Sequence, residues 1–432
     1  MTIFFRLFFY HSFLTTACWL QAQQPITKTD TIAKTDTIKY VGLEKQIDSI
    51  IHVAINKEAF PGCVVYAARE DSVLFHKSYG FHTYDSIRKV KEDDIYDLAS
   101  ITKIAGATLA LMKLYDDGII HLDEPINSYV DIGGQFGKVT IREALAHQGG
   151  IRPWIPYHQE IRKKDGTFRT KDMTSVRDDR HEFEITDQLY LSNQFYTKRI
   201  KKMIRKSPVI KDPGYKYSGL FFYLVPELVE TQTGSPFDQF LEDQFLQYLQ
   251  NPTFGFKPSE SYSLDRIPPT ELDTFFRNQL IHGKVHDEGA IMMKGISGNA
   301  GLFSNAEDLS KVMQLLLAKG NVDTLRLLSP QTIDLFTTAQ YPNLENRRGL
   351  GFDKPLLKYD SVASSVARDA SERSFGHSGY TGTLTWADPD NGLIFIFLSN
   401  RVYPTRNHRA LYELNVRPTI HQLLYDYLQK NG

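Results

Sequence analysis

The sequence predicts an α/β fold of the α+β type, with an antiparallel sheet flanked by helices and a helical lobe inserted into the chain. Strand-like segments occur near both ends of the chain, at 63–79 and 375–399, whereas 125–290 is dominated by helical and loop patterns. The chain has 432 residues, of which 41% are hydrophobic, and this length exceeds one typical core. We therefore expect an α/β lobe from about 43–124 and 291–430, and a helical lobe from about 125–290.

The elements of the α/β lobe follow in order along the chain. Apolar residues recur at helical spacing from Leu43 to Ala54, which predicts an amphipathic first helix. The segment 416–429 predicts a closing helix. The strands that we expect are 63–68, 73–79, 349–352 and 375–399.

Ser100 and Lys103 lie at the start of a predicted helix, 100–115. Residues three apart share a helix face, so the Lys103 amine can lie beside the Ser100 hydroxyl and take its proton. Unpaired N–H groups in the first turn of a helix also favour a developing oxyanion. A second Ser-x-x-Lys, Ser86–Lys89, precedes charged residues and is interpreted as a surface loop. By itself, the first motif leaves two interpretations of Ser100 open, an activated nucleophile or a helix N-cap.

Two later segments add to this motif. Tyr217-Ser218-Gly219 directly precedes a helix-like apolar run, 220–228. The segment Phe375–Thr383 contains His377-Ser378-Gly379 and leads into a predicted hairpin, 384–398. Glycines around a polar pair at a strand edge allow a ligand to approach the backbone closely.

With these three motifs in this order, the chain resembles the serine β-lactamase and penicillin-binding protein superfamily, in particular the class C-like branch that includes DD-carboxypeptidases and esterases. That branch pairs Ser-x-x-Lys with Tyr-x-Asn and Lys-Thr-Gly, at the positions of Tyr217–Gly219 and His377–Gly379 here. The resemblance extends from about Leu43 to Tyr427, and the segments 139–150 and 297–304 also resemble the family. It implies a β-lactamase/transpeptidase-like fold.

The resemblance implies a catalytic role for four residues. Ser100 would be the acylated nucleophile and Lys103 its base partner. Tyr217 would be a second proton shuttle, and His377 stands where the family usually has lysine. The reaction would be hydrolysis of an amide or ester through an acyl-enzyme.

The resemblance also implies how a substrate would be held. The backbone N–H groups of Ser100 and Tyr380 would form the oxyanion hole, and the strand edge that begins at Ser378 would pair with a peptide-like substrate. The residues expected along the substrate are Gly219, Ser378 and Gly379.

Two positions depart from the family pattern. Gly219 lacks the amide side chain that usually binds the acyl-amide group of the substrate. Free imidazole titrates near about 6.5, so we expect His377, if its surroundings perturb it little, to lose its proton between about pH 6 and 7.5, where lysine would stay charged. Both changes argue against a true β-lactamase and favour a DD-carboxypeptidase-like hydrolase of cell-wall peptides or an esterase-like hydrolase.

Two other functions remain open at this point. The same motifs fit a catalytically weak sensor module that binds penicillin or peptidoglycan peptides. His282 and His286, followed by Asp287 and Glu288, have the spacing of a metal site on a helix, although Gly283 disfavours a helix there. We expect no metal and no other cofactor, because the serine chemistry of the family needs none.

The N-terminus predicts export. Met1–Ala22 has one early positive charge and an apolar stretch before a small residue, which is typical of a secretory signal, and 23–42 contains a short polar repeat that predicts a flexible linker. We expect a periplasmic or secreted protein, with peripheral membrane association only if Cys18 is lipidated or the signal is uncleaved. Cys63 is expected in a buried strand. The net charge of −1 argues against a nucleic-acid partner.

Overall fold

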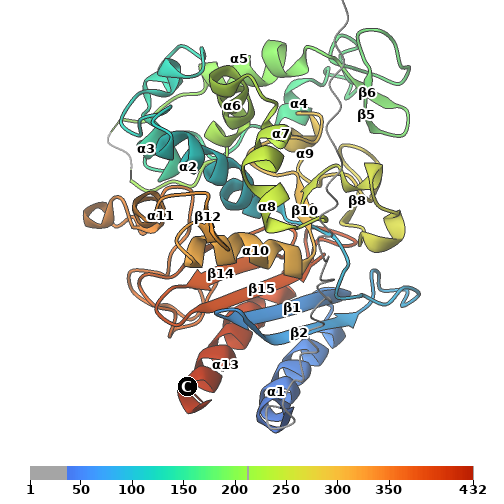
Figure 1. Ribbon diagram of the computed structural model, residues 1–432. Helices are drawn as coiled ribbons and strands as arrows, with labels where there is room; N and C mark the ends of the chain where they lie inside the picture. The colour runs from blue at the N-terminus through green and yellow to red at the C-terminus, as the bar shows by residue number, and fades with distance from the viewer. Residues whose placement is uncertain (1–36, 212–213, 432) are drawn as a thin grey trace, which may run out of the picture. The chain divides into compact units, whose positions relative to one another are not determined.

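A five-stranded antiparallel sheet forms the centre of the α/β lobe in the computed structural model, which describes residues 37–211 and 214–431 (Figure 1). The strand order is β13-β14-β15-β1-β2, so strands from the two ends of the chain pair where β1 meets β15. Because β1 and β15 are central and buried along almost their whole length, they carry nearly continuous apolar residues. The strands are β1 (Gly62–Arg69), β2 (Ser72–Gly80), β13 (Phe375–Ser378), β14 (Leu384–Asp388) and β15 (Leu393–Ser399).

Alternate residues of β1 face two different cores. Cys63 and Val65 pack in one cluster with α1 (Thr37–Asn56) and α13 (Val416–Asn431). Val64 belongs to the larger cluster, which continues into the helical lobe. Successive side chains of a strand point to opposite faces, so the sheet separates a small core below from a large core above.

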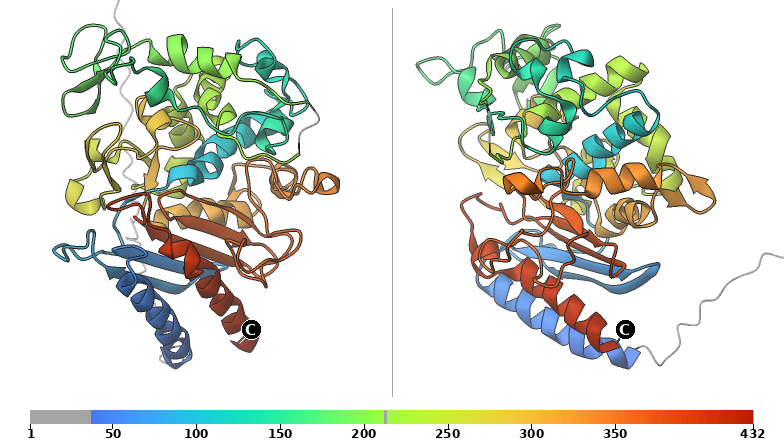
Figure 2. Two further views of the ribbon diagram at one scale, coloured as in Figure 1. Left: turned by 180° about the vertical axis from the view of Figure 1, so that it is seen from behind. Right: turned by 90° about the vertical axis from the view of Figure 1, so that its left-hand side faces the viewer.

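The helices cover both faces of the sheet. Helices α1 and α13 lie on the lower face, and α10 (Ala306–Leu317) lies on the upper face against β1, β14 and β15 (Figures 1 and 2). Helix α10 begins with an Asn305 side chain that accepts a hydrogen bond from the Asp308 N–H, which caps its first turn. Val41–Gly432 form one compact unit, and residues 37–40, at the end of the unit Met1–Tyr40, are helical.

The helical lobe lies above α10 in Figure 1 and consists of short helices and small sheets. The remaining α-helices of the described residues, from both lobes, are α2 (Leu109–Asp116), α3 (Ile141–Leu145), α4 (Tyr157–Glu160), α5 (Lys201–Lys206), α6 (Val225–Thr233), α7 (Phe237–Leu241), α8 (Gln247–Leu249), α9 (Glu288–Ile291), α11 (Pro330–Thr337) and α12 (Ala410–Glu413).

The remaining strands form four small antiparallel sheets. One of these sheets joins distant segments, since β10 pairs with both β3 and β7, whereas β6 pairs with the nearby strands β4 and β5. The strands are β3 (Tyr96–Asp97), β4 (Met173–Thr174), β5 (Phe183–Thr186), β6 (Leu189–Leu191), β7 (Gly255–Phe256), β8 (Glu271–Asp273), β9 (Gln279–Ile281), β10 (Leu302–Ser304), β11 (Asn321–Val322) and β12 (Leu325–Arg326).

The structure confirms most of the expected elements and corrects one. Helix α13, strands β1 and β2 and the hairpin β14–β15 lie where the sequence predicts them, and α1 starts earlier, at Thr37. The strand predicted at 349–352 is wrong. Gly351 has a φ of +81°, and the Gly349 N–H donates to the Phe352 carbonyl at 3.2 Å, so this segment closes into a turn.

The expected signal 1–22, most of the expected linker 23–42, and Cys18 lie outside the described residues. The part of the linker from Thr37 onward is helical. Cys63 is buried in β1, as expected. None of the helices in the described part of the chain has both the length and the hydropathy of a membrane span.

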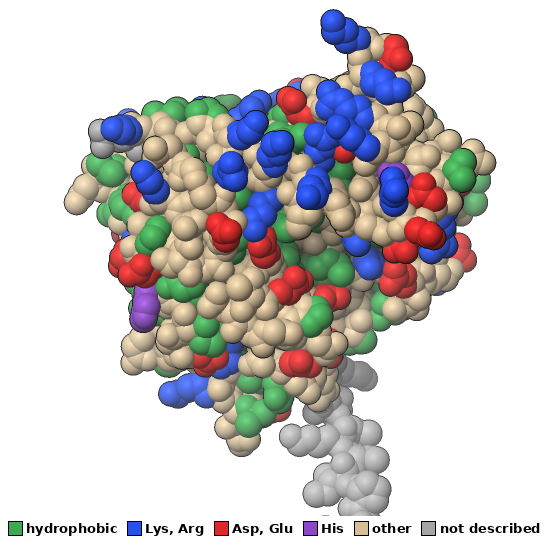
Figure 3. All heavy atoms as spheres, turned by 90° about the horizontal axis from the view of Figure 1, so that it is seen from above, with side chains coloured by type: hydrophobic (Ala, Val, Ile, Leu, Met, Phe, Trp, Pro, Cys, Tyr) green, Lys and Arg blue, Asp and Glu red, His purple; other side chains and the backbone are tan. Residues whose placement is uncertain are grey.

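Charge is distributed unevenly over the surface. Lys and Arg side chains gather on the face seen from above, over the helical lobe (Figure 3). Helix α5 and the turn before it contribute to this face with four exposed residues, Lys198, Lys202, Arg205 and Lys206. The near-zero net charge of the chain therefore hides a locally basic surface.

Candidate active site

Ser100 lies in a tight turn between β3 and the helix that ends in α2. The turn is a single 3₁₀ turn, Ala99–Ile101, followed by a π-helical segment, Lys103–Thr108. Ala99 has a φ of +46°, a strained value for alanine, and the Asp97 carboxylate holds it by accepting from the Ala99 N–H at 2.8 Å. Ser100 caps no helix here, because Leu98 occupies the cap position and makes no side-chain cap bond.

The structure brings Ser100 and Lys103 together. The Lys103 Nζ lies 3.0 Å from the Ser100 Oγ and 2.8 Å from the Asn299 carbonyl oxygen. Lys103 is only 3% exposed, and no carboxylate pairs with its Nζ among the ion pairs of the described residues. An amine in this position is within reach of the serine proton, as an activated nucleophile requires.

Tyr217 lies beside the same lysine. The Lys103 Nζ is 5.5 Å from the centroid of the Tyr217 ring, and the His147 ring packs against Tyr217 with a centroid separation of 4.5 Å. The His147 Nδ1 accepts from the Ser218 N–H at 3.2 Å, and the Ser218 Oγ donates to the Arg152 carbonyl at 2.7 Å. The neighbours of Tyr217 therefore fix the backbone that presents its hydroxyl.

Gly219 follows in the same segment and leaves room beside it. Its N–H donates to the Pro153 carbonyl at 3.1 Å. Within the described residues, no atom lies within 4 Å of the position that a Cβ on Gly219 would occupy. The space that a longer side chain would fill is therefore open at this edge of the site.

His377 is near Tyr217, but it is neutral. The two rings are 5.9 Å apart, and His377 is 3% exposed. Its Nδ1 lies 2.7 Å from the Ser378 carbonyl oxygen, which can only accept, so Nδ1 carries the proton and Nε2 has a free lone pair. Burial, with the nearby charges of Arg348 and Lys103, lowers the pKa of His377 to about 3. The expectation that His377 loses its proton between about pH 6 and 7.5 is therefore wrong.

The segment after β13 lies against the Ser100 turn. The Thr381 Oγ1 donates to the Asp97 carbonyl at 2.8 Å, and a Cβ on Gly379 would lie 2.5 Å from the Leu98 carbonyl oxygen. Only glycine permits this approach. It brings the backbone at Tyr380 toward the turn that carries Ser100, as an oxyanion hole requires.

Strand β13 is an edge strand of the main sheet. Ser378 pairs with Leu384 on its inner side, and Asp353 covers the outer side only at Gly376. The edge at Ser378 and Gly379 is left for an extended substrate to pair with. The expected pairing of Ser378 and Gly379 with a substrate stays a prediction.

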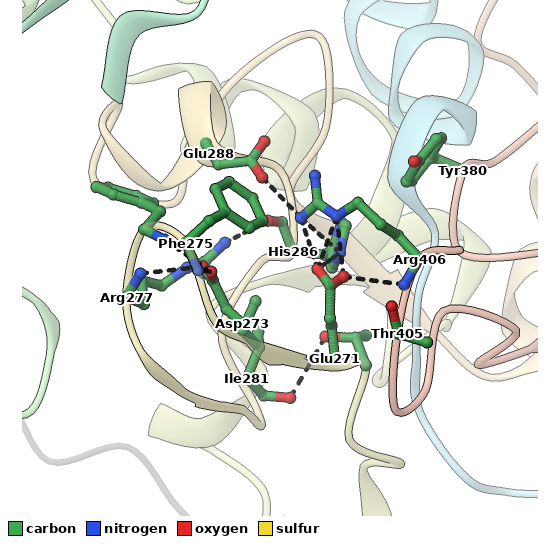
Figure 4. Close-up of polar contacts among 12 residues, drawn as sticks. Glu271, Asp273, Phe275, Arg277, Ile281, His286, Glu288, Tyr380, Thr405 and Arg406 are labelled. Carbon is green, nitrogen blue, oxygen red and sulfur yellow. Dashed lines mark hydrogen bonds and ion pairs between the residues drawn. The ribbon is translucent and has the colours of Figure 1, made fainter. Parts of the chain in front are cut away.

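A largely buried ionic network of Glu271, His286, Glu288 and Arg406 lies beside Tyr380 (Figure 4). The His286 Nε2 lies 2.7 Å from Glu271 Oε2, and Arg406 bonds both Glu271 and Glu288. Burial raises the pKa of Glu271, but the bonds from His286 and Arg406 outweigh it and hold this pKa at about 2. The His286 ring stacks on Tyr380 at 5.8 Å, so the network positions the loop that carries the Tyr380 N–H.

The two histidines considered for a metal site have separate partners. The His282 Nε2 lies 2.6 Å from the Ile267 carbonyl oxygen, whereas His286 pairs with Glu271. Over residues 37–211 and 214–431, no group of three His, Cys, Asp or Glu side chains is arranged to hold a metal ion. These residues fit the ionic network and do not form the metal site that their spacing suggested.

Three residues of the site were missed by the motif analysis. His147 and Asn299 lie in segments that resemble the family, but their contacts to Tyr217 and Lys103 depend on tertiary structure. Arg348, directly before the segment 349–352 that was mistaken for a strand, places its Cζ 5.2 Å from the Tyr217 ring centroid. The adjacent pair Arg347-Arg348 next to a glycine-rich turn was the available signal.

Comparison with known proteins agrees with this geometry. Residues 47–417 match the Beta-lactamase family model. The chain is 29% identical over 377 residues to a protein of Escherichia coli O157:H7 named "Putative D-alanyl-D-alanine carboxypeptidase", with 79% of each chain covered. It is 28% identical over 386 residues to "N-acetylmuramyl-L-alanine amidase" of Bacillus subtilis, covering 83% of this chain and 80% of that protein.

A solved structure gives the same fold. The octameric penicillin-binding protein homologue from Pyrococcus abyssi superposes with a TM-score of 0.63 at 18% identity, covering 89% of this chain and 77% of that one. The sheet with helices on both faces and an inserted helical lobe is thus the β-lactamase/transpeptidase-like fold. Since the family model spans most of the sequence, the chain belongs to the Beta-lactamase family of serine hydrolases.

Proposed function

We propose that the protein is a DD-carboxypeptidase-like hydrolase that cleaves an amide bond of cell-wall peptides through an acyl-enzyme on Ser100. The observation that carries the proposal is the 3.0 Å approach of the buried Lys103 Nζ to the Ser100 Oγ, with the Tyr217 ring beside the same Lys103 Nζ. A serine with an adjacent proton acceptor is the minimum arrangement for acyl transfer. The named carboxypeptidase relative supports the choice of substrate.

The proposed reaction has two balanced steps. The Lys103 amine or the Tyr217 oxygen takes the Ser100 proton, and Oγ bonds to the substrate carbonyl carbon while the carbonyl electron pair moves onto oxygen. The N–H groups of Ser100 and Tyr380 stabilise that oxyanion. Its collapse breaks the C–N bond, and the leaving amine receives the proton. Water then repeats the sequence on the ester, which releases the acid and restores the Ser100 hydroxyl.

A second candidate substrate is an amide between a cell-wall sugar and its peptide. Two aromatic side chains are unusually exposed around the site, Trp154 at 49% and Tyr380 at 50%. Trp154 follows Pro153, whose carbonyl binds the Gly219 N–H, so it lies next to the second motif. Exposed aromatic faces suit the flat apolar face of a sugar ring. The named amidase relative supports the same candidate.

The first test compares the wild type with Ser100→Ala. We expect the wild type to release D-alanine from a peptide ending in D-Ala-D-Ala, and the variant to lose about 10³-fold or more of the turnover. Intact-mass analysis with a fluorescent penicillin should show one adduct on the wild type and none on the variant. Because Ser100 caps no helix, the melting temperature of the variant should stay close to that of the wild type.

Further substrates, measured with the same two proteins, distinguish the alternative functions. A muramyl-L-alanine amide and a nitrophenyl ester report on sugar–peptide amidase and esterase activity. A penicillin adduct without turnover of any substrate would favour the sensor module. Wild-type rates in Ser100→Ala would refute the proposal.

We also propose that the protein is exported. The basis is the signal-like sequence Met1–Ala22, which ends before a polar repeat. Fractionation of the native host with N-terminal sequencing of the mature protein tests it. We expect a mature chain that begins near Gln23 outside the cytoplasm, and a cytoplasmic chain that retains Met1 would refute this.

A further inference from the structure

Arg348 is a buried cation beside the proposed proton-transfer residues. It is 5% exposed, and its Cζ lies 5.2 Å from the Tyr217 ring centroid, as close as the Lys103 Nζ on the same ring at 5.5 Å. Its Nε bonds the Tyr215 hydroxyl at 3.2 Å. Its Nη1 is buried, and no hydrogen-bond partner for it occurs in the described part of the chain.

The charge of Arg348 is not fully matched. The carboxylate nearest to it is that of Asp353, with an Nε–Oδ1 distance of 3.3 Å. Arg347 already binds both oxygens of that carboxylate, at 2.8 and 3.1 Å. Two guanidinium groups therefore share one carboxylate, which leaves a surplus positive charge in a low-dielectric setting next to Tyr217.

The surplus charge lies where the third motif lacks one. His377 has its proton on Nδ1 and faces Tyr217 as a neutral ring. We propose that Arg348 supplies the fixed positive charge that His377 does not, and so stabilises the negative charge that the Tyr217 oxygen carries when it acts as proton acceptor in acyl transfer. The inference rests on the proposed function of Ser100, and it assigns Arg348 as a positioning residue that acts through Tyr217.

The other groups around Tyr217 do not replace Arg348 as a source of fixed positive charge. Lys103 is the second cation on the ring, and it is bound to Ser100 and to a carbonyl. His147 accepts a backbone N–H through Nδ1, and burial, Arg348, His377 and Lys103 lower its pKa well below the usual range, so it is neutral. The titratable and charged groups that surround Tyr217 are Lys103, His147, Tyr215, Arg348, Asp353 and His377.

The test is the pH profile of kcat/KM with a nitrophenyl ester. An opposite charge within a few ångströms shifts a pKa by about 1 to 3 units. Arg348→Gln should therefore raise the apparent pKa of the rising limb by at least about 1 unit. Arg348→Lys should keep it near the wild-type value, since it keeps the charge. Adding His377→Lys to Arg348→Gln should lower it again, because the lysine restores a cation at the third motif.

Several outcomes would overturn the proposal. Arg348→Gln that lowers kcat/KM equally at every pH, or Arg348→Lys that shifts the profile as Arg348→Gln does, would give Arg348 a merely structural role. Arg373→Gln, which removes a surface arginine paired with Asp390, is the matched control and should leave the profile unchanged. If Arg348→Gln does not fold, Arg348→Met, which keeps most of the side-chain length without the charge, takes its place and should give the same rise.

Ser100→Ala, measured in parallel, separates this proposal from the proposed function. Persistent turnover in that variant would overturn the serine mechanism itself. An inactive Ser100→Ala together with an unshifted Arg348→Gln profile would overturn only the role of Arg348.

Discussion

At the scale of single residues, burial decides which groups of the site are charged. His377 and His147 are both under 4% exposed and lie close to Arg348 and Lys103. Desolvation and like charges each disfavour an imidazolium, so both rings are neutral. A histidine at position 377 suggests by its residue type a group that changes charge near neutral pH. Its buried surroundings keep it neutral over that range instead.

The neutral state of His377 predicts a flat pH dependence. The pKa of His377 is about 3, so its charge does not change between about pH 6 and 7.5. The ratio of kcat/KM for a peptide ending in D-alanine to that for a neutral ester should therefore stay constant over this range. His377→Lys should raise the ratio, because it adds a cation. A wild-type ratio that falls through the same range would contradict this assignment.

Gly219 predicts a gain of function. A Cβ there meets no described atom within 4 Å, and the φ of Gly219 is not among the positive values, so asparagine fits without strain. Gly219→Asn restores an amide that can bond an acyl-amide group, for which about 1 kcal/mol, or about fivefold in kcat/KM, is expected. N-acylated substrates should gain this factor, and simple esters should not. Gly219→Ala is the control, and an equal change for both substrates would refute the contact.

At the scale of elements, local patterns could predict the pieces of the site but not how they meet. The run 100–115 and the hairpin β14–β15 follow from periodicity and turn chemistry. The 349–352 segment reads as a strand by composition, yet the φ of Gly351 bends it. The contacts of Arg348 with Tyr217 and of Lys103 with the Asn299 carbonyl join residues more than 130 positions apart. Spacing within one segment carries no information about such contacts.

The contact through His286 between the hairpin β8–β9 and the loop at Tyr380 predicts that a substitution of Glu271 in β8 affects catalysis. Glu271→Gln removes the charge that Arg406 and His286 share, and His286 stacks on Tyr380. Because the oxyanion N–H is used mainly in the transition state, kcat should fall by about 10-fold or more while KM changes little. Steady-state kinetics on the ester, with Asp390→Asn as a surface control, checks this. A rise in KM alone would place the network at substrate binding instead.

At the scale of the whole molecule, the site lies where both ends of the chain and the inserted lobe meet. Ser100 and His377 come from segments 277 positions apart, each next to a strand that the large core holds in place. The separate small core beneath the sheet contains His421, which stacks on Phe395 at 4.9 Å and accepts from the Ala367 N–H through Nδ1. Burial lowers the pKa of His421 to about 3. Neutral buried histidines therefore occur on both sides of the sheet, His421 below it and His147 and His377 at the site.

Because of these buried histidines, we expect acid to destabilise the fold at pH values well above those at which carboxylates titrate. Each has a folded pKa below its unfolded value of about 6.5, so the unfolded state binds more protons as the pH falls below that value. The free energy of unfolding should therefore fall by up to about 1.4 kcal/mol per pH unit for each histidine, and stay level above about pH 7. Asp97, whose pKa burial raises, acts in the opposite direction, because its folded form binds a proton more readily than its unfolded form.

The measurement is urea unfolding at several values between about pH 7.5 and 5.5 in the wild type and in His421→Phe. The variant leaves the site untouched, because His421 packs beneath the sheet against Phe395 and Tyr425. Phenylalanine cannot take up a proton when the chain unfolds. The free energy of unfolding of the variant should therefore depend less steeply on pH, by the slope that corresponds to about one proton. Parallel curves for the two proteins would contradict the assignment, because they would show that His421 takes up no additional proton when the chain unfolds.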